Sequence, residues 1–128
     1  MMDRLSKAYQ NDVGMDISVT KIISLLPKQY LWIDLDMSIE VAPGYLGLIQ
    51  PRSSAAKRGI LIANCPIDPD YTGSIHVMVF NCSNETITIS PGEKFCQLVM
   101  VRCEPNPYGI VARKSGLRGN NGEGSTGK

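Results

Sequence analysis

The run Pro51-Arg52-Ser53-Ser54 carries side chains well suited to holding a phosphate group. It follows an apolar strand pattern and opens a predicted helical turn, so the free N–H groups and positive dipole end of that turn would face the same anion. Ser53 and Ser54 add hydroxyl donors, and Arg52 adds a planar fork that matches phosphate oxygens. The alternative is an ordinary helix N-cap beside a solvated arginine, and this run alone does not decide between the two.

A second candidate site is the corner Ile67-Asp68-Pro69-Asp70-Tyr71-Thr72-Gly73. Aspartate bonds its own backbone and proline fixes φ, so such a run is also ordinary turn chemistry. A carboxylate at a rigid corner can nevertheless orient and polarise a water for attack on phosphorus, and a neighbouring tyrosine ring can wall a sugar pocket. Asp68 and Tyr71 are therefore candidates for chemistry on a sugar phosphate.

The last part of the chain has its own composition. Residues 114–128 contain five glycines, and Leu117 is their only clearly apolar side chain. Such a segment buries too little surface to offset its ordering entropy, so we expect a β domain over residues 1–113 and a flexible arm over 114–128. A plain terminal tail is one interpretation. The other is a glycine-rich backbone that closes over phosphate with its N–H groups, aided by Arg118.

Length and charge limit the function classes. The 128 residues favour a single compact domain. Thirteen Lys and Arg oppose twelve Asp and Glu, for a net charge of +1, so no global field favours nucleic acid or an anionic membrane. The longest apolar stretch is far below the ~20 residues that cross a bilayer, and no signal peptide follows Met1. We expect a soluble, intracellular protein with no membrane or nucleic-acid partner, cytoplasmic or, if it is viral or eukaryotic, alternatively nuclear.

The cysteines and the single histidine do not suggest a metal or nucleophile site. The four cysteines lack Cys-x-x-Cys spacing, which argues against zinc. Cys82, Cys96 and Cys103 lie in or beside apolar strand patterns and are predicted to be reduced core residues. His76 alternates with apolar neighbours and is predicted to lie on the other face of its strand, outside any catalytic pair.

Period-two alternation between turn signals predicts an all-β sandwich or barrel. Turns are expected at Pro43-Gly44, Ser83-Asn84-Glu85 and Pro91-Gly92, and the only helical turn at residues 54–58. The predicted strands are residues 31–36, 38–41, 45–50, 60–64, 74–81, 86–89 and 95–102.

Five segments in order resemble the motifs of the trimeric deoxyuridine triphosphatase (dUTPase) family. They are Val13-Gly14-Met15-Asp16-Ile17, Pro51-Arg52-Ser53, Ile67-Asp68-Pro69-Asp70-Tyr71-Thr72-Gly73, Gly92-Glu93-Lys94-Phe95-Cys96-Gln97-Leu98, and Arg118-Gly119-Asn120-Asn121-Gly122-Glu123-Gly124-Ser125-Thr126-Gly127. Each motif alone is weak, whereas the ordered set is highly specific. The resemblance implies a distorted jelly roll, a homotrimer whose active sites are built from all three subunits with exchanged C-terminal arms, and hydrolysis of dUTP to dUMP and pyrophosphate with Mg²⁺.

The resemblance also implies roles for individual residues. Asp68 matches the carboxylate that activates the attacking water, and Tyr71 matches the ring that packs under deoxyribose and excludes a 2′-hydroxyl. Asp16 matches an acid that supports the metal and water shell, with Mg²⁺ held through substrate phosphates and waters. The phosphate chain would be bound by Arg52, Ser53, Ser54 and Gln97, and by Arg118, Gly124, Ser125 and Thr126 of the arm.

Two departures from the family pattern concern the base. The family usually has small residues before the Ile-Asp corner, where this chain has Asn64-Cys65-Pro66. Asn64 could read a pyrimidine edge through its amide, or Cys65 could narrow the slot, while Pro66 removes a backbone donor. Glu123 stands where the family carries an aromatic ring stacked over the base.

Two other functions stay open at this point. A dCTP deaminase of the same fold would need a glutamate two residues before Phe80, where this chain has Met78, and methionine cannot transfer a proton. A dUTPase-like trimer that mainly binds another protein is the further alternative. It is motivated by Glu123 and by the altered Asn64-Cys65-Pro66 run.

Replacing Glu123 with phenylalanine should lower the KM for dUTP, because a ring adds contact area over the base and removes a carboxylate near the triphosphate. The gain should be about 1–3 kcal/mol if stacking resembles that on other aromatic platforms. Steady-state kinetics with dUTP and dCTP measure it. An unchanged KM would show that this arm position does not contact the base.

Overall fold

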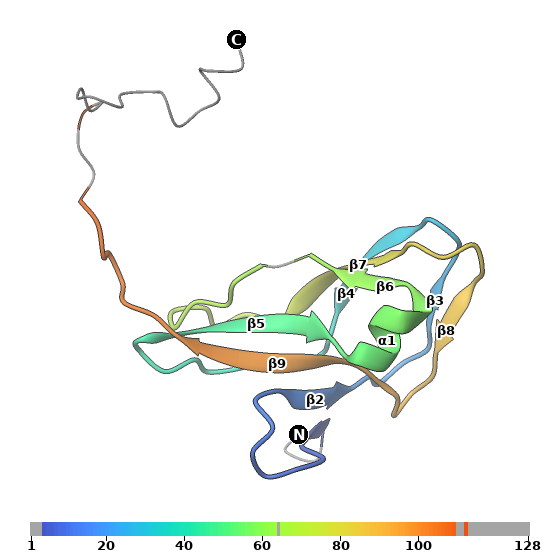
Figure 1. Ribbon diagram of the computed structural model, residues 1–128, viewed down its shortest axis with the longest axis horizontal. Coiled ribbons are helices and arrows are strands. Elements are labelled where there is room, and N and C mark those ends of the chain that lie inside the picture. Colours follow the sequence, from blue (N-terminus) through green and yellow to red (C-terminus); the bar gives the residue numbers. More distant parts are fainter. Residues whose placement is uncertain (1–3, 64, 110–111, 113–128) are drawn as a thin grey trace.

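The computed structural model describes residues 4–63, 65–109 and 112, and it confirms the all-β prediction. Within this part of the chain the structure consists of strands and a single short helix, α1, which lies between β5 and β6 (Figure 1). The elements are β1 (Leu5–Ser6), β2 (Met15–Ser18), β3 (Ile23–Leu25), β4 (Tyr30–Asp34), β5 (Tyr45–Pro51), α1 (Ser53–Arg58), β6 (Ile60–Ile62), β7 (His76–Asn81), β8 (Ile87–Ile89) and β9 (Lys94–Arg102).

The strands form three antiparallel sheets arranged as a distorted jelly roll. The first has the order β1-β2-β9-β5, the second pairs β3 with β8, and the third has the order β4-β7-β6. In Figure 1, β5 and β9 run side by side along one side of the molecule and the β3–β8 pair lies at one end. The pairs β2–β9, β5–β9, β3–β8 and β4–β7 join strands that are distant in sequence, so residues far apart along the chain are brought together.

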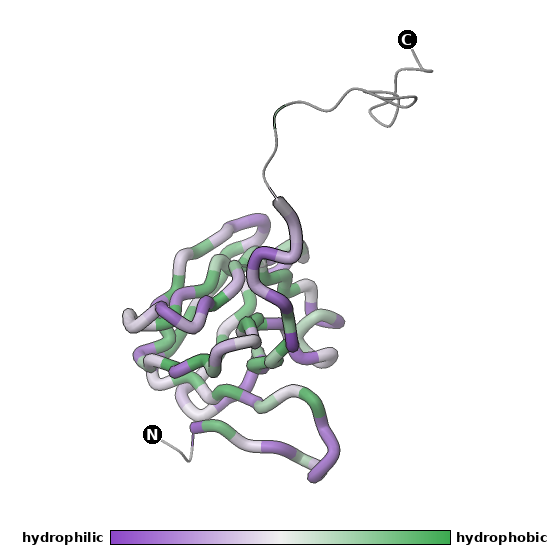
Figure 2. The backbone as a smooth tube through the Cα atoms, turned by 90° about the vertical axis from the view of Figure 1, so that its left-hand side faces the viewer, coloured by the Kyte–Doolittle hydropathy of each residue, from purple (hydrophilic) through white to green (hydrophobic). Residues whose placement is uncertain are grey.

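The core lies between the sheets and follows from the period of a strand, because alternate side chains point to opposite faces. On β7, Val77, Val79 and Asn81 are buried while the residues between them are half-exposed. Figure 2 shows hydrophobic and hydrophilic residues interspersed along the folded chain. The prediction that His76 lies on the face opposite Val77 and Val79 is confirmed.

The helix α1 begins at Ser53, one residue before the predicted turn, ends at Arg58 and is capped by Gly59. Gly59 has φ of 102°, a left-handed conformation that glycine adopts without strain, and its N–H caps the carbonyls of Ala55 and Ala56. This cap turns the chain directly into β6. At the other end of the helix, Arg52 is the N-cap residue and lies between the end of β5 and Ser53.

One predicted strand is wrong and others were missed. Residues 38–41 form no ladder, because Asp36 adopts a left-handed φ of 55° that ends the extended chain after β4. The segment is instead anchored by apolar burial, with Val41 in the core. The short strands β1, β2 and β3 were not predicted; they carry too few residues for a clear alternation, and their pairing partners are remote in sequence.

The prediction of core cysteines is confirmed for Cys96 and wrong for two others. Cys96 is fully buried between β2 and β5 on the central strand β9. Cys82 and Cys103 are only half-buried, because each follows the last residue of its strand, where the chain leaves the sheet. In the part of the chain that the structure describes, no helix is long and apolar enough to cross a membrane.

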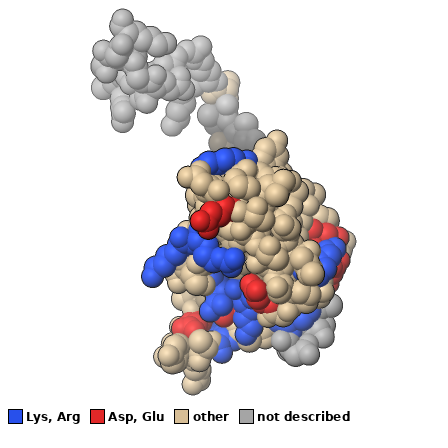
Figure 3. All heavy atoms as spheres, turned by 90° about the vertical axis from the view of Figure 1, so that its right-hand side faces the viewer, with Lys and Arg blue, Asp and Glu red and all other residues tan. Residues whose placement is uncertain are grey.

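Charged side chains of both signs share the surface. Viewed from the end that carries β3 and β8, lysine and arginine side chains gather on one part of the face, with acidic side chains among them (Figure 3). Arg58 of α1 faces Glu93 at 4.0 Å. Such exposed pairs contribute little to stability.

A buried amide joins β7 to two neighbouring loops. The Asn81 side chain is fully buried. Its Nδ2 donates to the carbonyls of Leu25, Leu26 and Glu85 at 3.0, 3.2 and 2.7 Å, and its Oδ1 accepts from the N–H and hydroxyl of Ser83. The amide therefore links the end of β3 and the loop after β7 to β7 itself, and its bond to the Leu25 carbonyl is buried.

Asn81→Ala should destabilise the protein by about 2–4 kcal/mol, because it removes all the hydrogen bonds of a fully buried amide, among them the buried bond to the Leu25 carbonyl. Urea denaturation followed by circular dichroism measures the loss. Asn84→Ala, in the exposed loop beside it, is the matched control and should change stability by less than about 0.5 kcal/mol. Equal stability of the two variants would contradict this role of the amide.

Candidate functional site

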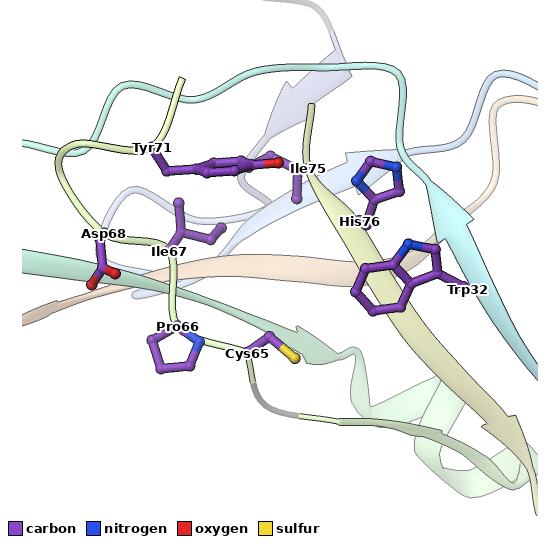
Figure 4. A pocket seen from close by; sticks show the side chains of 8 residues that line it. All are labelled: Trp32, Cys65, Pro66, Ile67, Asp68, Tyr71, Ile75 and His76. Atoms are coloured by element: carbon purple, nitrogen blue, oxygen red, sulfur yellow. The ribbon is translucent and has the colours of Figure 1, made fainter. Parts of the chain in front are cut away.

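Asp68 and Tyr71 line one pocket, of about 260 Å³, which we call the Asp68 pocket. Tyr71 forms one wall, and the stacked rings of Trp32 and His76 form the opposite wall (Figure 4). The complete lining is Trp32, Cys65, Pro66, Ile67, Asp68, Tyr71, Ile75 and His76. An apolar slot with a carboxylate at its edge suits a flat ring attached to a reacting polar group.

The Asp68 corner is positioned by strand β5. Gly47 and Ile67 exchange backbone hydrogen bonds of 2.9 and 2.8 Å, forming a bridge outside the main sheets. A Cβ on Gly47 would lie 3.3 Å from the Cβ of Ile67, so glycine permits this close approach. Ile67 is buried, whereas Asp68, the next residue, is exposed. The carboxylate is thus carried by an anchored backbone.

Tyr71 is held by the end of the same turn. Its N–H donates to the Asp68 carbonyl at 3.1 Å, and its hydroxyl donates to the Ser74 carbonyl at 2.6 Å. A Cβ on Gly73 would lie 2.6 Å from that hydroxyl, so the ring can lie across the turn only because residue 73 is glycine. The ring is therefore fixed at both ends although 43% of Tyr71 is exposed.

The candidate phosphate-binding residues line a different pocket, of about 250 Å³, which we call the Arg52 pocket. It brings together the first, second and fourth sequence motifs from β2, the β5–α1 junction and β9. Its lining is Ala8, Asp12, Val13, Gly14, Asp16, Arg52, Ser53 and Gln97.

The Arg52 side chain is oriented by neighbouring acceptors. Its Nε lies 3.2 Å from the Asp16 carboxylate, and its Nη1 donates to the Lys94 carbonyl at 3.2 Å. Gln97 faces Asp16 across the β2–β9 ladder, and its amide donates to the Pro51 carbonyl at 3.3 Å. A Cβ on Gly14 would collide with the Gln97 side chain, so the glycine leaves the space that this amide occupies.

The structure divides the predicted residues into two groups. Cys65, Asp68 and Tyr71 line the Asp68 pocket, while Asp16, Arg52, Ser53 and Gln97 line the Arg52 pocket. Ser54 is exposed on α1 and lines neither of these pockets. Asn64, Arg118, Glu123, Gly124, Ser125 and Thr126 lie outside the described residues.

Trp32 and His76 are pocket residues that the sequence analysis missed. Their rings stack with centroids 5.4 Å apart and an interplanar angle of 8°. Alternation does place Trp32 and His76 on the outward faces of their strands. Only the β4–β7 register, which sets Asp34 opposite His76, brings the two rings together.

A carboxylate next to this stack is kept ionised. The Ser74 hydroxyl and the Asp36 N–H both donate to the Asp34 carboxylate, and these bonds lower the pKa of Asp34 from its ordinary value. Since the folded pKa lies below the unfolded one, the stabilisation is present above the unfolded pKa and is lost as the pH falls through the folded pKa.

The sequence matches the dUTPase family over residues 2–127. The chain belongs to the dUTPase family. The deoxyuridine 5′-triphosphate nucleotidohydrolase of Cytophaga hutchinsonii is 40% identical over 129 residues, which cover 94% of this chain and 84% of that protein. The protein of the same name from Escherichia phage T5 is 36% identical over 108 residues, covering 81% of this chain and 73% of the relative.

A solved structure shows the same fold. The native EIAV dUTPase superposes with a TM-score of 0.76 at 29% identity, covering 88% of this chain and 93% of the other. The resemblance found in the five motifs is thus confirmed. The names of the relatives agree with the expected enzyme class.

The cysteines of this dUTPase should differ sharply in reactivity. Burial, with the nearby Asp16 carboxylate adding to it, raises the pKa of Cys96 to about 12, whereas Cys65 is exposed in the Asp68 pocket. Because the thiolate is the nucleophile, iodoacetamide at pH 8 should alkylate Cys65 and spare Cys96 in the folded protein. Peptide mass spectrometry measures both, and alkylation of Cys96 as fast as Cys65 would contradict the buried placement.

Proposed function

We propose that this protein is a dUTP diphosphatase that converts dUTP to dUMP and pyrophosphate. The observation that carries the proposal is the joint placement of the Asp68 carboxylate and the Tyr71 ring in one pocket. Family membership and the names of the relatives support the same substrate. The Asp68 pocket would hold the nucleoside, with the α-phosphate at its Asp68 edge.

In the proposed reaction Asp68 acts as general base. Its carboxylate orients a water and accepts a proton as the water oxygen forms a bond to the α-phosphorus. The bond from the α-phosphorus to the bridging oxygen breaks, and its electron pair leaves with pyrophosphate. The exposed position of Asp68 on an anchored backbone suits a base that must meet both water and substrate.

The Arg52 pocket would bind the phosphate chain. Asp16 and the Lys94 carbonyl fix the guanidinium before substrate arrives, so less entropy is lost on binding. Charge grows on the departing pyrophosphate during bond breaking, and a preoriented guanidinium stabilises that charge. Ser53 and Gln97 would add hydroxyl and amide donors.

Mg²⁺ fits this scheme as part of the substrate complex. In the described segments no group of three or more His, Cys, Asp or Glu side chains could hold a metal ion. The Arg52 pocket offers the donors of Arg52, Ser53 and Gln97, which suit phosphate oxygens, beside the carboxylates of Asp12 and Asp16. Magnesium keeps several waters and binds readily through nucleotide phosphates, where it would neutralise their charge.

The two pockets would form complete sites in a homotrimer, in which one subunit's Asp68 pocket meets another's Arg52 pocket. The outward face of the β4-β7-β6 sheet supports self-association. On it Tyr30, Trp32 and Leu61 are 66, 57 and 50% exposed. Contiguous apolar surface of this kind marks interfaces. The arm, residues 114–128, would complete each site by closing over bound nucleotide.

Asp68→Asn should lower turnover of dUTP by at least about 100-fold while leaving nucleotide binding largely intact, because it removes the base but keeps the shape. Pyrophosphate release with Mg²⁺ from dUTP, dCTP, dTTP and UTP, together with an ammonia assay, measures activity and selectivity. The exposed neighbour Asp70→Asn is the matched control and should retain activity. Near-normal turnover of Asp68→Asn would overturn the mechanism.

A mixing experiment tests the shared sites. Asp68→Asn and Arg52→Ala should each be inactive, and co-refolded mixtures should regain about a quarter of wild-type activity if one site combines pockets from different subunits at random. Arg52→Ala mixed with Gln97→Ala is the control, since both changes fall in one pocket, and it should not recover. Light scattering must report a trimer, and failure of the first mixture to recover would contradict sharing.

A further inference from the structure

One backbone carbonyl tethers both walls of the Asp68 pocket. The Ser74 oxygen accepts the Tyr71 hydroxyl at 2.6 Å and lies 3.1 Å from Nδ1 of His76. A carbonyl can only accept, so Nδ1 carries the proton in this contact. The Tyr71 wall and the Trp32–His76 wall (Figure 4) are therefore held by the same residue.

Asp34 in turn fixes Ser74. The Ser74 hydroxyl donates to Oδ1 of Asp34, which also accepts the Asp36 N–H at 2.8 Å. The other carboxylate oxygen, Oδ2, lies 3.5 Å from Nε2 of His76. Asp34 thus contacts the pocket network twice: through the Ser74 hydroxyl, and at Nε2 of His76, a contact that is attractive when the imidazole carries a proton on both nitrogens.

Asp34 does not belong to the lining of the Asp68 pocket. Asp34 is part of β4, where the strand register sets it opposite His76, and it contacts the residues of the pocket wall without lining the pocket. The family motifs used in the sequence analysis do not include it. Its place in the network is visible only in the folded chain.

We propose that Asp34 is a positioning residue that sets the shape of the nucleoside end of the site by holding Ser74, and through it Tyr71 and His76. This inference rests on the proposed function. Because the network fixes the pocket walls and not the reacting phosphate, losing it should weaken nucleoside binding and discrimination against a 2′-hydroxyl. The chemical step at Asp68 should be nearly unaffected.

The test compares Asp34→Ala with Asp34→Asn, whose amide oxygen can still accept from Ser74 and from the Asp36 N–H. Asp36→Asn is the control, because the Asp36 side chain contacts Thr20 and Lys21 instead of the pocket. Asp34→Ala should raise the KM for dUTP about tenfold with kcat within about twofold, as expected for one lost tether in ground-state binding. It should also narrow the preference for dUTP over UTP. Asp34→Asn should stay close to wild type.

Trp32, the only tryptophan of the chain, gives a readout that does not need catalysis. The emission of an indole responds to a ring stacked on it, so release of His76 in Asp34→Ala should change Trp32 fluorescence. Titration with the non-hydrolysable analogue dUpNHpp should then show weaker binding than in Asp34→Asn or Asp36→Asn. Thermal denaturation must first show that all variants are folded.

The outcomes separate this inference from the proposed function. A KM, selectivity and emission of Asp34→Ala equal to those of Asp36→Asn would overturn the positioning role. A wild-type protein that releases no pyrophosphate from dUTP would overturn the proposed function. In that case the emission change of Asp34→Ala alone would support, or its absence overturn, the tethering of His76 by Asp34.

Discussion

The backbone bridge between Gly47 and Ile67 is the constraint on which the site depends. Strand β5 carries Gly47 near its middle and ends at Pro51, directly before Arg52. The same strand therefore anchors the Asp68 corner and leads into the phosphate-binding run. A side chain at residue 47 would press on Ile67. The Asp68 corner would then lose its attachment to β5, whereas the β5–α1 junction would still be held by β9, which pairs with β5 as far as Pro51.

The two pockets have opposite chemistry. The Asp68 pocket is built of aromatic and aliphatic walls with a carboxylate at its edge, whereas the Arg52 pocket is mainly polar, with a guanidinium, a hydroxyl and an amide beside the carboxylates of Asp12 and Asp16. A nucleoside triphosphate has the same two ends, an apolar ring and a polyanion.

Much of the site could be predicted from the sequence because its chemistry lies in short local runs. Proline and aspartate indicate turns at Pro51-Arg52-Ser53 and Ile67-Asp68-Pro69. The alternation of apolar and polar residues predicts the all-β class with one short helical turn. The bounds of the strands do not follow from alternation alone. The pattern of residues 38–41 predicts a strand, but the left-handed backbone conformation of Asp36 ends the ladder before this segment. A strand needs a second strand to pair with, and the local sequence pattern does not show which segment that is.

The sequence by itself determined which side chains are chemically able to act, because residue type and local spacing are written in the chain. Only the tertiary structure decided which of them meet. Asp34, Ser74 and His76 form one network solely because β4 and β7 pair in a register that sets Asp34 against His76. Asp16 reaches Arg52 only because β2 and β5 flank the same strand, β9. Long-range pairing arises from the packing of the whole core, and no short stretch of sequence encodes it.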